Sequence, residues 1–247
     1  MASSLDKLNQ NQGDLWHSGE VTSDRSQWVP YGGPALTSRQ VCYWKVKVKS
    51  KDGAESGWSE PARWTMGLLQ SSDWSAQWIG LEQAFAWDAP RAVNTRLSAR
   101  YFRKEASLSK TVKQATVYIS GVGLYELSLN GQKVGDAVLA PGPTEFDKRV
   151  LYNTYDVTNY LQTGNNAFGV TLGNGRYFAV RVGQPKVPAT THYGYPKMRL
   201  QIEVTYTDGT TERIVSDNTW KVTADGPIRT NNEYDGEEYD ATRELTN

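Results

Sequence analysis

Residues 118–177 decide the fold class; they read YISGVGLYELSLNGQKVGDAVLAPGPTEFDKRVLYNTYDVTNYLQTGNNAFGVTLGNGRY. In this stretch Leu127, Leu129 and Val134 alternate with polar residues on either side of Asn130-Gly131. Asn-Gly accepts the positive φ angles of a two-residue hairpin turn. The stretch therefore predicts two antiparallel strands joined by a tight turn.

The same alternation of apolar and polar residues recurs along the chain, between turn residues such as Gly, Asn, Asp and Pro. The segments that show it are RQVCYWKVKVKS, ATVYISG, YELSLNG, NAFGVTLGN, MRLQIEVTYTDG and TERIVSDNTWKV. A second hairpin is predicted at Asp208-Gly209. Helical periodicity sustained over three turns is almost absent, so we expect an all-β protein of the sandwich class.

Composition excludes several classes of partner. The 247 residues carry 27 Lys plus Arg and 27 Asp plus Glu, so no basic excess points to nucleic acid. No apolar run approaches the roughly 18–20 residues that cross a bilayer, so no membrane partner is expected. The opening segment MASSLDKLNQ lacks the hydrophobic stretch of a signal peptide.

The chain has a single cysteine, which rules out an intrachain disulfide. In VCYWKVKVK the apolar residues that share a face with Cys42 alternate with Tyr and Lys on the other face. We therefore expect Cys42 to be a buried, inert thiol.

The motifs of the central stretch resemble the N-terminal β-sandwich of bacterial α-L-rhamnosidases of the glycoside hydrolase family 78 type. The motifs that carry the resemblance are Gly-x-Tyr-x-Leu-x-Leu-Asn-Gly-x-x-Val-Gly-Asp from Gly123, Leu-x-Pro-Gly-x-Thr from Leu139, Tyr-Asn-Thr-Tyr-Asp-Val-Thr from Tyr152, Gly-x-Asn from Gly164, and Gly-Glu-x-Tyr-Asp-Ala-x-x-Glu from Gly236. The resemblance implies a jelly-roll, galactose-binding-like domain over residues 70–247.

Residues 1–69 resemble a fibronectin type III module. The shared pattern is Leu-Trp-His-Ser-Gly, Tyr-x-Gly, Leu-x-Ser-x-x-x-Tyr-Trp-Lys-Val-x-Val, Asp-Gly and Trp-Ser-x-Pro. The region supports four or five strands where such a module has about seven, so the module is expected to be partial, with an unpaired edge on its N-terminal side. Two β-sandwiches in tandem are thus predicted.

Function is implied by this resemblance. The parent would hydrolyse terminal α-L-rhamnosides without a cofactor, in a later helical barrel that does not fit in the remaining residues. We therefore expect a non-catalytic fragment, inactive alone, that acts as a structural accessory domain supporting substrate recognition. Its partners would be rhamnose-containing glycans and the C-terminal domains of the parent, in the periplasm or outside the cell.

Two other functions remain open. The chain could be an autonomous carbohydrate-binding module for L-rhamnose, or an enzyme that would need two facing carboxylates. The densest carboxylate cluster reads more simply as a solvated turn and linker, so no catalytic residue is assigned; its members are Glu233, Asp235, Glu237, Glu238 and Asp240.

Sugar binding needs an aromatic face and planar polar groups, and the long irregular segment 176–197 offers both. The candidate carbohydrate-binding residues are Trp87, Arg176, Tyr177, Tyr193 and Tyr195. The alternative, favoured for each residue taken singly, is that Tyr177 and Phe178 pack the loop against the sheet and that Trp87 covers an interface with another domain. The family commonly has Gly-Trp-Tyr where this chain has Gly175-Arg176-Tyr177, a change that removes one sugar platform.

No cofactor is expected, but the resemblance leaves a bound calcium ion open, because oxygen-rich loops suit a hard cation. Candidate oxygen donors are Asn130, Asp136, Asp147, Asp156, Asn165 and Asn174. Turn formation and capping account equally for Asn130, Asp156 and Asn174. No metal ligand is assigned on this basis.

Overall fold

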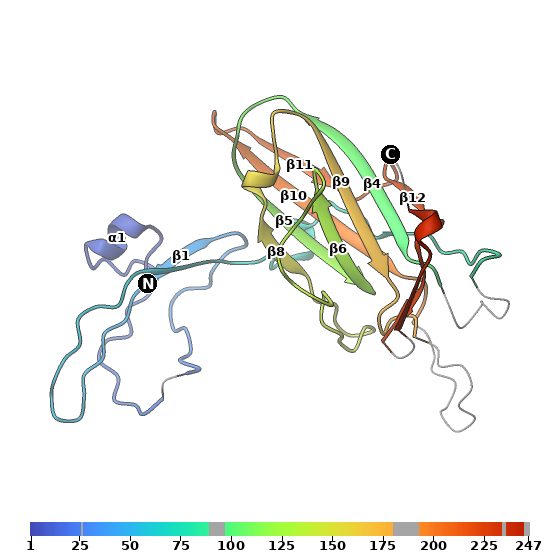
Figure 1. Ribbon diagram of the computed structural model, residues 1–247. Coiled ribbons are helices and arrows are strands. Elements are labelled where there is room, and N and C mark those ends of the chain that lie inside the picture. The colour runs from blue at the N-terminus through green and yellow to red at the C-terminus, as the bar shows by residue number, and fades with distance from the viewer. Residues whose placement is uncertain (26, 89–96, 180–192, 234–235, 245–247) are drawn as a thin grey trace, which may run out of the picture. The chain divides into compact units, whose positions relative to one another are not determined.

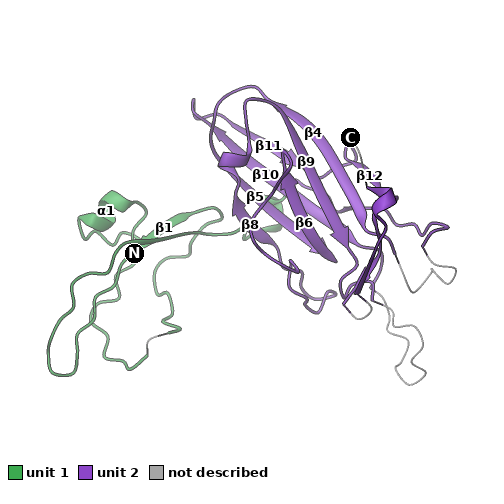
Figure 2. Cartoon of the chain, in the orientation of Figure 1, with its two compact units in different colours: residues 1–74 green, residues 75–247 purple. Residues whose placement is uncertain are grey.

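The computed structural model describes residues 1–25, 27–88, 97–179, 193–233 and 236–244 (Figure 1). Two compact units make up the chain, residues 1–74 and residues 75–247 (Figure 2).

The first unit is built around one antiparallel strand pair. It comprises α1 (Leu5–Asn9), β1 (Val41–Trp44), β2 (Ala62–Thr65) and the 3-10 helix η1 (Ser71–Asp73). Strand β1 pairs with β2 so that Cys42 faces Trp64, and the pairing continues irregularly to Val48 and Ser56. Cys42 is fully buried, as predicted, and burial raises the pKa of its thiol, which disfavours the reactive thiolate.

The outer edge of β1 is partly paired. Ala2 donates its N–H to the Tyr43 carbonyl at 2.8 Å and accepts the Tyr43 N–H at 3.0 Å. The N-terminal residues thereby cover one position of the edge that the sequence predicts to be open. In the part of this unit that the structure describes, regular strands are limited to β1 and β2.

The second unit is a two-sheet β-sandwich, as predicted (Figure 1). One sheet has the order β11 (Thr211–Val215), β10 (Lys197–Tyr206), β5 (Val112–Val122), β8 (Asn153–Asp156), with β3 (Ile79–Gly80) also on β10. The other has the order β12 (Lys221–Thr223), β4 (Arg100–Leu108), β9 (Gly164–Gly173), β6 (Leu124–Leu129), β7 (Gln132–Lys133). The second unit also contains a hairpin of β13 (Ile228–Asn232) and β14 (Gly236–Tyr239). It has the 3-10 helices η2 (Thr158–Tyr160) and η3 (Ala241–Arg243) as well.

Alternate residues of facing strands form the core. Phe168, Val170 and Leu172 of β9 are buried. They belong to the same apolar cluster as Ile119 of β5 and Ile202 of β10, in the opposite sheet. Each such side chain contributes about 1.5–3 kcal/mol on burial, so the packing of the two sheets is the main source of stability.

The predicted hairpin at Asn130-Gly131 is present. Both residues have positive φ, 51° and 78°, as a type I′ turn requires. The Asn130 amide donates to the Tyr160 carbonyl at 2.8 Å, and its oxygen accepts the Ala167 N–H at 2.8 Å. The turn residue thus also fastens η2 and β9.

Four turns share one local pattern, Asp followed two residues later by Thr, at Asp156, Asp208, Asp217 and Asp240. In each, one carboxylate oxygen accepts the Thr N–H at 2.9–3.0 Å and also the Thr hydroxyl. Lysines from β4 and the turn after it add charge to two of them: Lys104 pairs with Asp217 and Lys110 with Asp208.

Replacing Gly131 with Ala is expected to destabilise the second unit by about 1 kcal/mol, because a Cβ is strained at positive φ. Urea unfolding measures this change. Gly142→Ala is the control, since Gly142 is exposed, has no positive φ and leaves room for a Cβ. Equal effects of the two substitutions would contradict the turn assignment.

Acid should remove the contribution of Asp208. Hydrogen bonds from Lys110 and Thr210 hold the pKa of the folded Asp208 carboxyl well below its ordinary 3.8. A depressed folded pKa contributes stability above the unfolded pKa, and this is lost as the pH falls toward the folded pKa. Melting temperatures of the unmodified chain and Asp208→Asn should therefore differ at pH 7 and converge toward pH 2. A constant offset across this range would show that Asp208 does not act through its charge.

Candidate functional site

The candidate residues gather at one end of the second unit, which we call the loop end. Strand register creates it: Arg100 at the start of β4 lies opposite Leu172 near the end of β9, and Leu124 at the start of β6 lies opposite Gly173. Strand β10 also starts here, with Lys197 opposite Val122. The described segments of the loop end are 81–88, 136–152, 174–179, 193–196 and 224–233.

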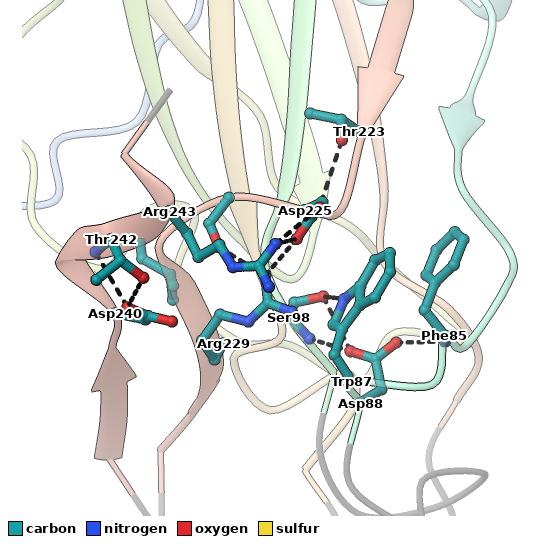
Figure 3. A network of polar contacts seen from close by, with 12 residues as sticks. Phe85, Trp87, Asp88, Ser98, Thr223, Asp225, Arg229, Asp240, Thr242 and Arg243 are labelled. Atoms are coloured by element: carbon teal, nitrogen blue, oxygen red, sulfur yellow. Dashed lines mark hydrogen bonds and ion pairs between the residues drawn. The ribbon is translucent and has the colours of Figure 1, made fainter. Parts of the chain in front are cut away.

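Asp88 organises the segment that carries Trp87 (Figure 3). Its buried carboxylate accepts the N–H groups of Phe85 and Ser98, both at 2.7 Å, and the Ser98 hydroxyl at 2.9 Å. The Trp87 indole N–H in turn donates to that hydroxyl at 3.2 Å. The four hydrogen bonds fix the indole against the start of β4.

Both faces of the Trp87 ring are in contact with other side chains. Figure 3 shows the indole between Phe85 and Arg229. The Phe85 ring lies parallel to it with centroids 4.7 Å apart, and the Arg229 guanidinium carbon lies 5.2 Å from the ring centroid. Phe85 and the Arg229 guanidinium lie on the two sides of the indole while Trp87 stays 40% exposed, so the geometry favours a packing role of Trp87 over an open sugar platform.

Asp225 joins the last segments of the chain to this stack. Arg229 pairs with the Asp225 carboxylate at 2.9 Å and also donates to the Gly226 carbonyl at 2.9 Å. Arg243 of η3 approaches the same carboxylate at 3.3 Å. One carboxylate thus ties β13 and η3 together (Figure 3).

Arg100 is a buried charge that sequence reasoning missed. Its guanidinium donates to the carbonyls of Ser98 and Gln83, both at 2.5 Å. Burial lowers the pKa of Arg100, and the nearby Asp88 and Tyr195 act in the opposite direction. Arg100 shares the inward face of β4 with Phe102, so strand alternation was the signal that could have found it.

Three aromatic rings form what we call the aromatic cluster. Tyr177 and Tyr193 stack at 5.7 Å with a 19° interplanar angle, and Phe146 meets both edge-on at 5.2 Å. The Tyr193 N–H donates to the Tyr177 carbonyl at 3.1 Å. Sequence reasoning chose the two tyrosines but not Phe146, which lies in a separate loop between β7 and β8.

Tyr195 lies outside this cluster. It stacks on the buried Phe178, with centroids 5.8 Å apart. Gly194, with φ 145°, separates Tyr193 from Tyr195 and allows the two rings to reach different partners. Tyr195 therefore packs over Phe178, whereas Tyr193 remains 51% exposed.

Ion pairs border the aromatic cluster. Arg176 pairs with Glu233 at 2.9 Å and Lys197 with Glu82 at 2.5 Å. Burial raises the pKa of Tyr177; Lys197 opposes this rise and Glu82 adds to it, which places that ion pair within electrostatic range of the ring. The border therefore offers both hydrogen-bond donors and acceptors with no net charge.

The carboxylate cluster is spread along a surface hairpin. Glu237 and Glu238 lie on β14, whose four residues are all exposed, and Asp240 caps η3 through Thr242. Glu233 pairs with Arg176, and Asp235 lies outside the described residues. This placement is that of a solvated turn.

The calcium candidates do not share one location. Asn130 follows the last residue of β6, whereas Asn174 follows Gly173 opposite its first residue, so β6 separates them by roughly 17–20 Å. The Asn174 amide is buried and donates to the Leu97 carbonyl at 2.7 Å. Among the described residues, no group of three or more Asp, Glu, His or Cys could hold a metal ion. Calcium stays a prediction that these residues do not support as one ligand set.

No helix in the described part of the chain is long and apolar enough to cross a membrane.

An antiparallel sandwich with polar and aromatic loops at one end, preceded by a small β unit, defines a modular β-sandwich protein. The chain belongs to the family of α-L-rhamnosidase N-terminal domains, which matches residues 110–247. Residues 2–70 match a second family, the Rha78A-like N-terminal immunoglobulin domain.

Relatives extend well beyond the matched region. An α-L-rhamnosidase of Formosa agariphila is 42% identical over 99% of this chain and 27% of its own length. One from Alteromonas sp. is 35% identical over 94% of the chain and 25% of its own length. The chain thus spans about a quarter of these curated relatives.

Two solved structures show the same architecture. The α-L-rhamnosidase from Dictyoglumus thermophilum has a TM-score of 0.79 at 39% identity, covering 99% of this chain and 27% of that chain. The Streptomyces avermitilis α-L-rhamnosidase complexed with L-rhamnose has a TM-score of 0.81 at 25% identity, covering 98% and 39%.

Removing the shared carboxylate should loosen the loop end. Asp225→Asn is expected to cost about 1 kcal/mol in urea unfolding, because the Arg229 side chain is only 14% exposed and loses its ion pair. Glu126→Gln, which removes the exposed ion pair with Lys133, is the control and should cost less than about 0.5 kcal/mol. Equal small losses would mean that the Asp225 network contributes no more than an ordinary surface pair.

Proposed function

We propose that this chain is a non-catalytic accessory region of an α-L-rhamnosidase, which braces the other domains of that enzyme and supports substrate recognition. The parent would hydrolyse terminal α-L-rhamnosides in rhamnose-containing glycans, in the periplasm or outside the cell. Family membership and the fourfold greater length of the relatives support this proposal.

The observation that carries the bracing role is an apolar pair on the loop between β7 and β8. Val138 is 80% exposed and Leu139 is 68% exposed, the latter at a positive φ of 56°. Two adjacent exposed aliphatic side chains offer apolar surface that another domain could bury.

The backbone around this pair is held in place. Tyr125 donates its N–H to the Ala140 carbonyl at 2.7 Å, and Ala140 is buried. Further along, the Ser120 hydroxyl donates to the Leu151 carbonyl at 2.7 Å. A residue other than glycine is strained at positive φ, so the conformation that points Leu139 outward lowers the stability of the loop. The occupant we propose is a neighbouring domain of the parent enzyme.

A chimera tests this role. This chain replaces the matched quarter of the Formosa agariphila enzyme, and Val138→Ser with Leu139→Ser is introduced. The double substitution should lower the stability of the chimera by about 2 kcal/mol or more through lost burial, and leave the isolated chain unchanged. Thermal unfolding of both proteins and rhamnosidase activity of the chimera are the measurements.

Val21→Ser with Val29→Ser is the matched control, because these valines are 66% and 63% exposed in the first unit. A chimera that tolerates the Val138 and Leu139 changes as well as it tolerates the control would overturn the bracing role.

A second candidate function is an autonomous carbohydrate-binding module for L-rhamnose. The observation that favours it is the aromatic cluster, where Tyr193 stacks on Tyr177 and remains half exposed. The two functions separate in solution, because a module binds sugar without any other domain.

A further inference from the structure

We propose that the outward face of Tyr193 is a stacking platform for a single neutral pyranose with an apolar face, of which L-rhamnose is the first to test. The inference rests on the second candidate function and assigns its site. Of the five candidate carbohydrate-binding residues, Tyr193 would contact the sugar, and Tyr177 and Phe146 would hold its ring in place.

The geometry of the aromatic cluster leaves one side of Tyr193 open. The three centroid distances, 5.2, 5.2 and 5.7 Å, form a nearly equilateral triangle. Seen from Tyr193, both ring partners therefore lie toward the same side. Tyr193 as a whole residue is 51% exposed, and we place its open surface on the side of the ring away from these two partners.

The platform is held before any ligand arrives. Tyr177 stacks behind Tyr193, Phe146 packs edge-on against both, and the Tyr193 N–H is bonded to the Tyr177 carbonyl. A ring fixed in this way loses little rotamer freedom when a sugar binds. A Cβ added to Gly194 would lie 3.4 Å from the Tyr177 hydroxyl, so Gly194 lets the backbone pass close to the supporting ring.

Charge at the border selects a neutral ligand. The ion pairs Arg176–Glu233 and Lys197–Glu82 carry no net charge, yet they supply cationic donors and carboxylate acceptors for hydroxyl groups. Because the ion pairs carry no net charge, they give an anionic sugar no net electrostatic attraction. A pyranose with C–H groups on one face and hydroxyls at its rim fits this arrangement.

L-rhamnose suits the platform because its C6 is a methyl group, which enlarges the apolar surface that stacks on an aromatic ring. In D-galactose the C6 group is a hydroxymethyl group, and this sugar serves as the comparison. The other aromatic candidates are less suited, since Trp87 lies between Phe85 and Arg229, and Tyr195 stacks on Phe178.

Calorimetric titration of L-rhamnose into the intact chain, with D-galactose as the comparison, tests the site. Saturable binding of L-rhamnose in the millimolar range is expected, weakened at least about tenfold by Tyr193→Ala and retained by Tyr193→Phe. Tyr239→Ala is the matched control, because Tyr239 is exposed to a similar degree, 55%, but lies on β14. It should leave binding unchanged.

Saturation-transfer NMR on the unmodified chain gives an independent readout if Tyr193→Ala does not fold. Transfer should reach the C6 methyl and the protons of one pyranose face. Absence of L-rhamnose binding, or full binding by a folded Tyr193→Ala variant, would overturn the platform. Neither outcome affects the bracing role, which the chimera tests through Val138 and Leu139.

Discussion

The register of β9 between β4 and β6 is the constraint on which the second unit depends. It sets Phe168, Val170 and Leu172 toward the opposite sheet and places Arg100 and Leu124 at the same end. A slip by one residue would turn the β9 core residues to solvent and move every loop that follows from the strand ends. The loop end is thus a consequence of core packing, because the same pairing that buries the apolar residues brings distant loops together.

At the loop end, hydrogen bonds and ion pairs of charged side chains hold the segments together, whereas apolar packing does so in the core. Arg100 and Asp88 are both buried, and hydrogen bonds to backbone and hydroxyl groups lower the cost of removing them from water, although the buried Arg100 Nε has no hydrogen-bond partner among the described residues. Further out, Arg229 covers Trp87 while it shares Asp225 with Arg243. The proposed bracing and sugar-binding contacts use different side chains of one loop, the aliphatic Val138 and the aromatic Phe146.

Local rules predicted the fold better than they predicted the site. Asn130-Gly131 and Cys42 behave as turn chemistry and strand alternation require, and the all-β architecture follows from the same signals. Tyr177 and Tyr193 meet as neighbours of one loop, but Phe146 joins them from a different one, and nothing in its surrounding sequence encodes that contact. Trp87 is a further case, because its partners Phe85 and Arg229 come together only through folding and could not be read from the sequence around it.

The position of Cys42 has a practical consequence for studying the two units separately. It is the only thiol in the chain, and it is fully buried on β1 of the first unit. A thiol reagent can reach it only when that unit opens, so the alkylation rate reports the opening equilibrium of residues 1–74 while the sandwich contributes no signal. The alkylation rate of Cys42 therefore measures local unfolding of the first unit without an added label.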